Sequence, residues 1–136
     1  MRVLGLDVGE KTIGVAVSDP MGWTAQGVTV IRRTSLPRDL EALKAFVQEY
    51  QAQKFVVGLP RRTDGSYGPE TKKIYNFGSE LERELGLPVE YCDERFSTVA
   101  AERILLEGDV SRAKRRQVID KVAATVILQA YLDRKA

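Results

Sequence analysis

Three acidic residues stand at positions that suit chemistry better than packing. Asp7 interrupts the apolar run 3–9, which otherwise has the composition of a strand covered on both faces. A buried carboxylate is costly to ionise unless it is paired, hydrogen-bonded or bound to a cation. If Glu94 and Asp120 converge on Asp7, the three carboxylates would hold divalent metal. We therefore predict a phosphodiester-cleaving site on these three acids.

Two of these acids also have plainer interpretations. Asp7 could cap the turn over residues 9–12, because aspartate is common in such turns. Glu94 could belong to a solvated charged turn, and the neighbouring Asp93 could replace it in a site. Successive strand residues point to opposite sides, so only one of this pair would face the site. We select Glu94, which follows a strand predicted to lie beside the first, at its carboxyl end.

Asp120 lies on the face of a predicted helix that should pack against the sheet. A carboxylate in a first helical turn is favoured by the positive end of the helix dipole, which is the alternative explanation. A residue that served only as a dipole partner would more often face solvent. By helical spacing, the face of Asp120 also carries Ala123, Ala124, Ile127 and Tyr131. The two alanines would permit close approach, so we retain Asp120 in the site.

The rest of the composition restricts the chemistry to oxygen ligands. The chain has no histidine and a single cysteine, Cys92. This excludes histidine-based acid–base catalysis, a multi-cysteine zinc site and an internal disulfide. Carboxylates suit Mg²⁺ or Mn²⁺. Three of them on separate elements could hold two ions about 4 Å apart, one to activate water and one to stabilise the leaving oxygen.

Basic residues near the predicted site form a second group. Four of them directly precede the last predicted helix, where cations oppose the helix dipole unless an anion such as phosphate binds there. Others lie in a glycine-rich loop after the fourth strand or beside the acids. Each could be an ordinary solvated residue, but together they predict contacts with a nucleic-acid backbone. The set is Lys11, Arg61, Arg62, Arg95, Arg112, Lys114, Arg115 and Arg116.

Length and composition are those of an ordinary globular chain. Its 136 residues fit one domain, and the net charge of +2 is too small to indicate nucleic-acid binding by itself. Charged residues at positions 2, 7, 10 and 11 argue against a signal peptide. No apolar run reaches the length of about 18 residues needed to span a membrane. We expect a cytoplasmic protein with no membrane partner.

The apolar pattern predicts the elements that must position these residues. Strands are predicted over residues 2–8, 12–19, 27–33, 54–59 and 89–92. Helices are predicted over 37–51, over 69–85, from Ser97 or Thr98 to 107, and over 117–133, with 108–116 as a charged link. Short links favour antiparallel pairing of the first three strands, and strand–helix alternation follows. The sequence thus predicts an α/β domain with a five-stranded mixed sheet flanked by helices.

Two glycines bear on the second predicted helix. Gly86 follows its last residue and should close it as a C-cap, since glycine readily adopts the left-handed conformation found there. Gly78 lies inside the helix and should weaken it, because glycine is a poor helix former.

Several sequence blocks resemble the YqgF/RuvX family. They are LGLDVG at 4–9, TIGVA at 12–16, VGLP at 57–60, DGS at 64–66, DERFST at 93–98, DKVAA at 120–124 and ILQ at 127–129. The blocks run from residue 4 towards the C-terminus in the family's order, and jointly they are highly specific. Asp7, Glu94 and Asp120 match the family's acidic positions without a departure.

The resemblance implies a ribonuclease-H-like fold and a single nuclease domain over residues 1–136. It also implies an endonuclease that depends on Mg²⁺ or Mn²⁺ and acts on structured nucleic acid. The substrate would be Holliday-junction DNA, in recombination and repair, or precursor 16S ribosomal RNA, in ribosome biogenesis. The sequence does not separate these two. A resolvase must cut two strands symmetrically and would therefore act as a homodimer.

Two other functions fit parts of the sequence. A non-catalytic nucleic-acid-binding or ribosome-assembly factor would use the same basic surface, and Asp7→Asn would leave its activity unchanged. A nucleotide-binding phosphotransferase of the sugar-kinase and actin type also opens with a strand bearing Asp-x-Gly and then a hairpin. Such enzymes close two domains over ATP, whereas this chain is long enough for one. The nuclease hypothesis instead predicts that Asp7→Asn abolishes cleavage and retains binding.

Overall fold

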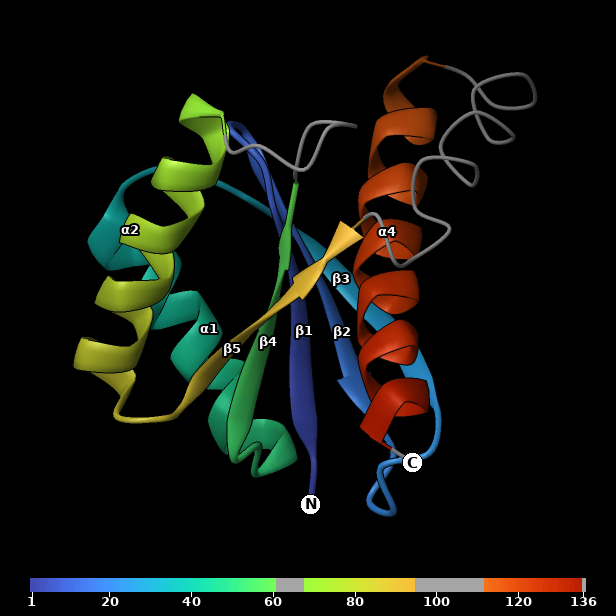
Figure 1. The fold of residues 1–136 in the computed structure, drawn as a ribbon. Helices are drawn as coiled ribbons and strands as arrows, with labels where there is room; N and C mark the ends of the chain where they lie inside the picture. Colours follow the sequence, from blue (N-terminus) through green and yellow to red (C-terminus); the bar gives the residue numbers. More distant parts are fainter. Residues whose placement is uncertain (61–67, 95–111, 136) are drawn as a thin grey trace.

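The structure is a computed structural model that describes residues 1–60, 68–94 and 112–135; the side chains of 112–120 lie outside the description (Figure 1). Its elements are β1 (Val3–Val8), β2 (Thr12–Ser18), β3 (Ala25–Arg32), α1 (Leu36–Tyr50), β4 (Lys54–Leu59), α2 (Pro69–Leu85), β5 (Val89–Asp93) and α4 (Arg112–Lys135). The helix predicted from Ser97 or Thr98 to 107 falls outside the described residues.

The five strands form one mixed sheet in the order β3-β2-β1-β4-β5. The first three strands pair antiparallel, and β4 pairs parallel with both β1 and β5. This confirms the predicted mixed sheet, in which short links join antiparallel neighbours and a helix connects parallel ones. One expected neighbour was wrong: the strand before Glu94 was predicted to lie beside the first strand, but β4 lies between β5 and β1. The tight link after β1 closes through a backbone bond from Gly9 N to Thr12 O of 2.9 Å.

Local capping explains where α1 and α2 begin and end. Ser35 is the N-cap of α1, and its hydroxyl accepts a hydrogen bond from the backbone N of Arg38. Pro69 opens α2, where its missing N–H costs no helical bond. Gly86 closes α2 in the left-handed conformation, with φ of 71°. The predicted C-cap is therefore confirmed.

Two apolar layers cover the two faces of the sheet. On one face, α1 and α2 pack over large strand residues that include Leu4, Leu6 and Phe55 (Figure 1). On the other face, α4 is the helix of the described residues that packs over smaller side chains such as Ala16 and Val56. Within the described residues, no helix combines the length and apolarity that a membrane-spanning segment needs.

The last helix begins earlier than the sequence predicted. We expected residues 108–116 to form a link and the helix to start at Gln117, but α4 already includes Arg112. The five residues 112–116 are arginines, lysine and alanine, which all have high helix propensity. That propensity outweighs the cost of clustered cations at a helix N-terminus. The other boundaries of the described elements match the predictions to within two residues.

Candidate active site

Asp7 lies near the carboxyl end of β1, on the face that α4 covers. Its position follows from strand alternation, because Val3 and Gly5 on the same face both lie under α4. A Cβ built on Gly5 would lie 2.7 Å from the Cβ of Leu128, so the helix is in direct contact with the strand there. Asp7 is only 9% exposed. A buried carboxylate on the packed face of a strand is the predicted arrangement.

Glu94 lies on the same face, beside the carboxyl end of the neighbouring strand. It directly follows β5 and is half-buried. A Cβ built on Gly58 of β4 would lie 3.2 Å from Glu94 Oε1 and would collide with Ile127 of α4. The Glu94 carboxylate therefore occupies space that a side chain at position 58 would fill. Register places Gly58 between β1 and β5, one residue beyond the Leu6–Val57 pair.

Asp93 lies on the opposite face from Glu94. It pairs with Leu59 in the parallel ladder, and Leu59 belongs to the core beneath α1 and α2. Neighbouring residues in a ladder point to the same side of the sheet. The sequence left open which of Asp93 and Glu94 shares the face of Asp7. The structure shows that Glu94 does.

The backbone of Asp120 lies in α4, one helical turn before Ala124. The helix runs antiparallel to β1 (Figure 1), and Ala124 O lies over Gly5. Two strand residues span about 6.6 Å and four helical residues span about 6 Å. Position 120 therefore lies at about the same height along the sheet as Asp7. Asp7, Glu94 and the backbone of residue 120 therefore lie at one end of one face; the Asp120 side chain is outside the description.

The predicted basic residues are described only in part. Lys11 lies exposed in the link between β1 and β2, next to the end of the strand that bears Asp7. The structure does not describe Arg61, Arg62 or Arg95. The backbone of the four cations that precede Asp120 forms the first turns of α4, without described side chains; these are Arg112, Lys114, Arg115 and Arg116.

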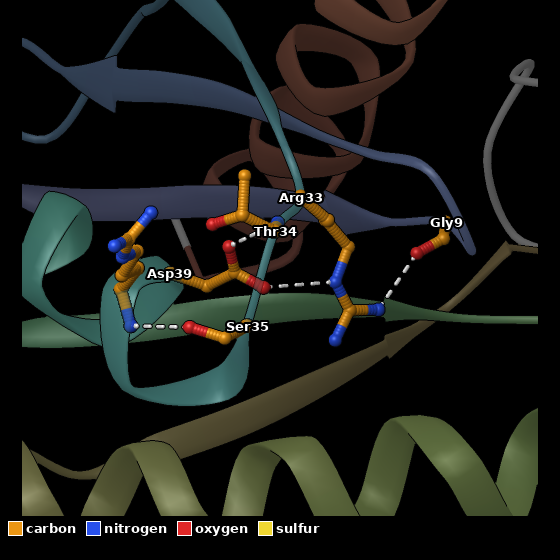
Figure 2. Close-up of polar contacts among 6 residues, drawn as sticks. Gly9, Arg33, Thr34, Ser35 and Asp39 are labelled. Atoms are coloured by element: carbon orange, nitrogen blue, oxygen red, sulfur yellow. Dashed lines mark hydrogen bonds and ion pairs between the residues drawn. The ribbon is translucent and has the colours of Figure 1, made fainter.

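A polar network that was not predicted from the sequence lies at the end of β1, on the opposite side of that strand from α4. Arg33, just after β3, donates from Nε to Asp39 Oδ2 at 3.2 Å and from a terminal nitrogen to the Gly9 carbonyl at 2.8 Å (Figure 2). Asp39 lies in the first turn of α1 and is buried. The sequence does place an aspartate four residues after Ser35, and that position predicts a favourable interaction with the helix dipole. It does not predict that Arg33 pairs with this aspartate.

The far end of α4 is held by a second polar cluster. Lys54 Nζ donates to the Tyr131 hydroxyl at 3.1 Å and to Glu90 Oε1 at 3.2 Å. The Tyr131 hydroxyl raises the pKa of Lys54 and lowers the pKa of Glu90. Two residues before Tyr131, Gln129 Oε1 accepts a hydrogen bond from the backbone N of Ala25, the first residue of β3, at 2.9 Å. These bonds fix α4 to β3, β4 and β5 at the end opposite the acids.

Among the described side chains, no group of three histidine, cysteine or acidic residues is arranged to hold a metal ion. Asp120, the third acid of the predicted trio, lies outside the described side chains. Asp7 and Glu94 nevertheless offer carboxylate oxygens, one of them buried, and hard oxygen donors are the ligands that Mg²⁺ and Mn²⁺ prefer. Cys92, the lone thiol, is buried, and this burial raises its pKa, as expected for a packing residue.

Comparison with known proteins identifies a family that matches almost the whole chain. The family model described as "RuvX: Holliday junction resolvase" matches residues 1–134. A Heliobacterium modesticaldum protein named "Putative pre-16S rRNA nuclease" is 59% identical over 136 residues, covering 100% of this chain and 91% of that protein. A Moorella thermoacetica protein of the same name is 61% identical over 134 residues, covering 98% and 96%.

Solved structures agree on the fold. Thermus thermophilus RuvC, in complex with a Holliday junction substrate, superposes with a TM-score of 0.60 at 14% identity, covering 100% of this chain and 97% of that one. The fowlpox virus Holliday junction resolvase gives 0.57 at 14% identity, covering 100% of both chains. The architecture is therefore the RuvC-like ribonuclease H fold, and the chain belongs to the RuvX family of nucleases.

Proposed function

We propose that this chain is a metal-dependent endonuclease whose site comprises Asp7, Glu94 and Asp120, within a single nuclease domain. The observation that supports this most directly is the arrangement of Asp7 and Glu94. Their carboxylates come from separate strands and lie on one face, at the carboxyl ends of parallel strands. This edge is where open α/β sheets commonly carry their sites.

The donor set fits Mg²⁺ or Mn²⁺. Asp7, Glu94 and Asp120 would be the protein ligands, and all three supply carboxylate oxygens. When bound, the metal would supply a more acidic water and would stabilise negative charge on the leaving oxygen. The chain's own part is to hold these carboxylates oriented in a partly dry site. Gly58 serves this by leaving room for the Glu94 carboxylate against Ile127.

We propose precursor 16S ribosomal RNA as the substrate to test first. The curated relatives that share 59% and 61% identity carry that substrate in their names. Branched DNA is the second candidate. The family description names a Holliday junction resolvase, and RuvC, which shares the fold, was solved in complex with a Holliday junction substrate. Cutting a junction would require a homodimer with paired sites, whereas RNA processing would not.

The predicted cations would contact the phosphate backbone of either substrate. Lys11 is exposed beside the end of β1, and four more cations lie along the first turns of α4, the helix that carries Asp120. Such contacts position a nucleic acid without reading its sequence. Binding should therefore weaken as the salt concentration rises.

A cleavage panel tests this proposal. Wild-type protein, Asp7→Asn, Glu94→Gln and the control Asp93→Asn are incubated with precursor RNA and with four-way DNA junctions, each with Mg²⁺, Mn²⁺ or chelator. We expect Asp7→Asn and Glu94→Gln to lose at least about a hundredfold in cleavage rate while retaining substrate binding. Asp93→Asn should cleave like wild type, because Asp93 faces the other side of the sheet.

Two outcomes would contradict the proposal. If folded wild-type protein with metal cleaves neither substrate, the enzyme hypothesis fails and a non-catalytic binding or assembly role replaces it. If Asp7→Asn cleaves at the wild-type rate, the site assignment fails even though the chain is a nuclease.

A further inference from the structure

The side chain of Arg33 bridges two parts of the molecule on the opposite side of β1 from α4. Its guanidinium donates to Asp39 Oδ2 at 3.2 Å and to the Gly9 carbonyl at 2.8 Å (Figure 2). Gly9 is the first residue after Val8, the last residue of β1, and is two residues from Asp7. Arg33 therefore connects helix α1 directly to the end of the strand that bears the proposed ligand.

Both the guanidinium and its carboxylate partner are held in place. Asp39 is 3% exposed, and its second oxygen, Oδ1, accepts a hydrogen bond from Thr34 N at 3.1 Å. The Arg33 guanidinium carbon lies 5.2 Å from the centre of the Phe77 ring of α2, within the range of a cation–π contact. The group that reaches Gly9 is thus fixed by α1 on one side and α2 on another.

The turn after β1 depends on Arg33 through its backbone as well. Arg33 N donates to the Lys11 carbonyl at 2.8 Å, and Gly9 N donates to Thr12 O at 2.9 Å. Gly9, Glu10 and Lys11 are exposed, so packing does little to hold this turn. Hydrogen bonds must therefore set the path of the chain directly after Asp7.

We propose that Arg33 is a positioning residue for the nuclease site: its bridge from Asp39 to the Gly9 carbonyl fixes the end of β1 and so orients the Asp7 carboxylate. This inference rests on the proposed function, because it takes Asp7 as a metal ligand. Arg33 itself lies on the other side of the sheet and contacts neither metal nor substrate. Its effect passes through the backbone of residues 7–9.

Arginine has a property that this position requires. Its planar guanidinium presents several N–H groups in a rigid fork, so one group can serve two acceptors in fixed directions. A lysine would keep the positive charge, but its flexible ammonium would not hold the same two acceptors in the same geometry. Replacing Arg33 by lysine therefore separates geometry from charge.

The test measures Mn²⁺ affinity by calorimetry, which does not depend on turnover. Wild type is compared with Arg33→Ala, Arg33→Lys, Asp39→Asn and a control, Arg38→Ala, which removes an exposed arginine from the start of α1. Circular dichroism first establishes the temperature at which each variant is fully folded. We expect both Arg33 variants and Asp39→Asn to bind Mn²⁺ about tenfold more weakly, as is common when a ligand's supporting shell is removed. Arg38→Ala should match wild type.

Cleavage kinetics provide a second measurement. Loss of orientation at Asp7 should lower kcat and leave KM for nucleic acid nearly unchanged, because the phosphate contacts lie elsewhere. A merely structural role would lower the melting temperature of the Arg33 variants without changing Mn²⁺ affinity or kcat in the folded protein. That result would overturn the inference, and so would wild-type Mn²⁺ affinity in Arg33→Lys.

Failure of the inference can be distinguished from failure of the proposed function. If wild type binds no Mn²⁺, or if Asp7→Asn binds it as well as wild type, the proposed metal site itself is wrong. If wild-type binding depends on Asp7 but every Arg33 variant keeps it, only the positioning role is wrong.

Discussion

The two faces of the sheet are packed in opposite ways. Beneath α1 and α2, the strands present large side chains such as Leu4, Leu6 and Phe55. Beneath α4, the strands repeatedly present no side chain at all. At Gly5, Gly27 and Gly58 an added Cβ would meet atoms of α4. One face is packed with large apolar side chains, whereas glycines on the other face let α4 approach the strands closely.

This difference separates stability from chemistry. Burying a large apolar side chain contributes about 1.5–3 kcal/mol, so the face with bulk carries much of the folding energy. Glycine contributes no such burial, but it lets a helix backbone approach a strand closely. On that face lie Asp7 and Glu94, and the backbone of Asp120 passes at the same height. In the proposed site, this close approach would bring Asp120 of α4 near the end of the sheet that carries Asp7 and Glu94.

Phe55→Ala should have the largest effect on stability and almost none on the site. Phe55 is fully buried beneath the two helices, and its removal leaves a cavity. We expect a loss of about 3–5 kcal/mol in the free energy of unfolding, measured by urea denaturation. Mn²⁺ affinity of the folded protein should stay at the wild-type value. A comparable loss of metal affinity would show that the two faces are not independent.

Gly5→Ala should have a smaller effect on stability and a larger one on the site. The added methyl would lie 2.7 Å from Leu128 Cβ and 3.3 Å from Ala124 O, and neither atom can rotate away. The helix must shift, at a cost of about 1–3 kcal/mol by the same urea measurement. Because α4 carries Asp120, Mn²⁺ affinity and cleavage should both fall. Unchanged values for stability and affinity would contradict close packing at this point.

Gly58→Ala is the matched control for that substitution. Its added methyl meets the rotatable end of Ile127, so α4 itself need not move and the stability cost should be lower than for Gly5→Ala. The same methyl would lie 3.2 Å from Glu94 Oε1. Any loss of metal affinity in this variant should therefore come from Glu94.

The smallest expected effect concerns the polar end of the α4 face. The Tyr131 hydroxyl, and then Lys54, hold the pKa of Glu90 below its ordinary value of 4.5. Because the folded-state pKa is the lower one, this contribution is fully present above about pH 4.5 and is lost as the pH falls through the folded value. Glu90 is 38% exposed, so screening by solvent limits the contribution to less than about 1 kcal/mol.

Glu90→Gln should therefore destabilise the protein slightly at neutral pH, and this destabilisation should shrink as the pH falls from about 4.5 towards about 3. The measurement is urea unfolding of both proteins across that range, with Glu41→Gln on the exposed side of α1 as the control. A difference between wild type and Glu90→Gln that does not change with pH would rule out the proposed ionic contribution.

Local patterns were enough to predict most of the fold. The first strand and the Gly86 C-cap both depend on residues close together in sequence, and both were predicted correctly. The α4 boundary was wrong because the cluster of cations at 112–116 was given more weight than its helix propensity. Strand alternation predicted that only one of Asp93 and Glu94 would share the face of Asp7, but the register that decides for Glu94 came from the structure.

Long-range contacts could not be predicted from local patterns. Gly78 was expected only to weaken α2, yet a Cβ there would collide with the hydroxyl of Tyr91 on β5, which explains why glycine suits the position. The bond from the Arg33 guanidinium to the Gly9 carbonyl likewise joins two segments that are distant in sequence. Such pairs become neighbours only after the elements pack.

The anchoring of α4 by Tyr131 makes the helix a lever. From Tyr131 to Asp120 is eleven residues, or about 16 Å along the axis. With the Tyr131 end as the pivot, a tilt of only about 5° would displace position 120 by roughly 1.4 Å, and a misplacement of about 1 Å can reduce catalysis a hundredfold. The displacement caused by a substitution at Lys54 or Tyr131 would therefore grow along the length of α4 and be larger at position 120 than at the anchored end.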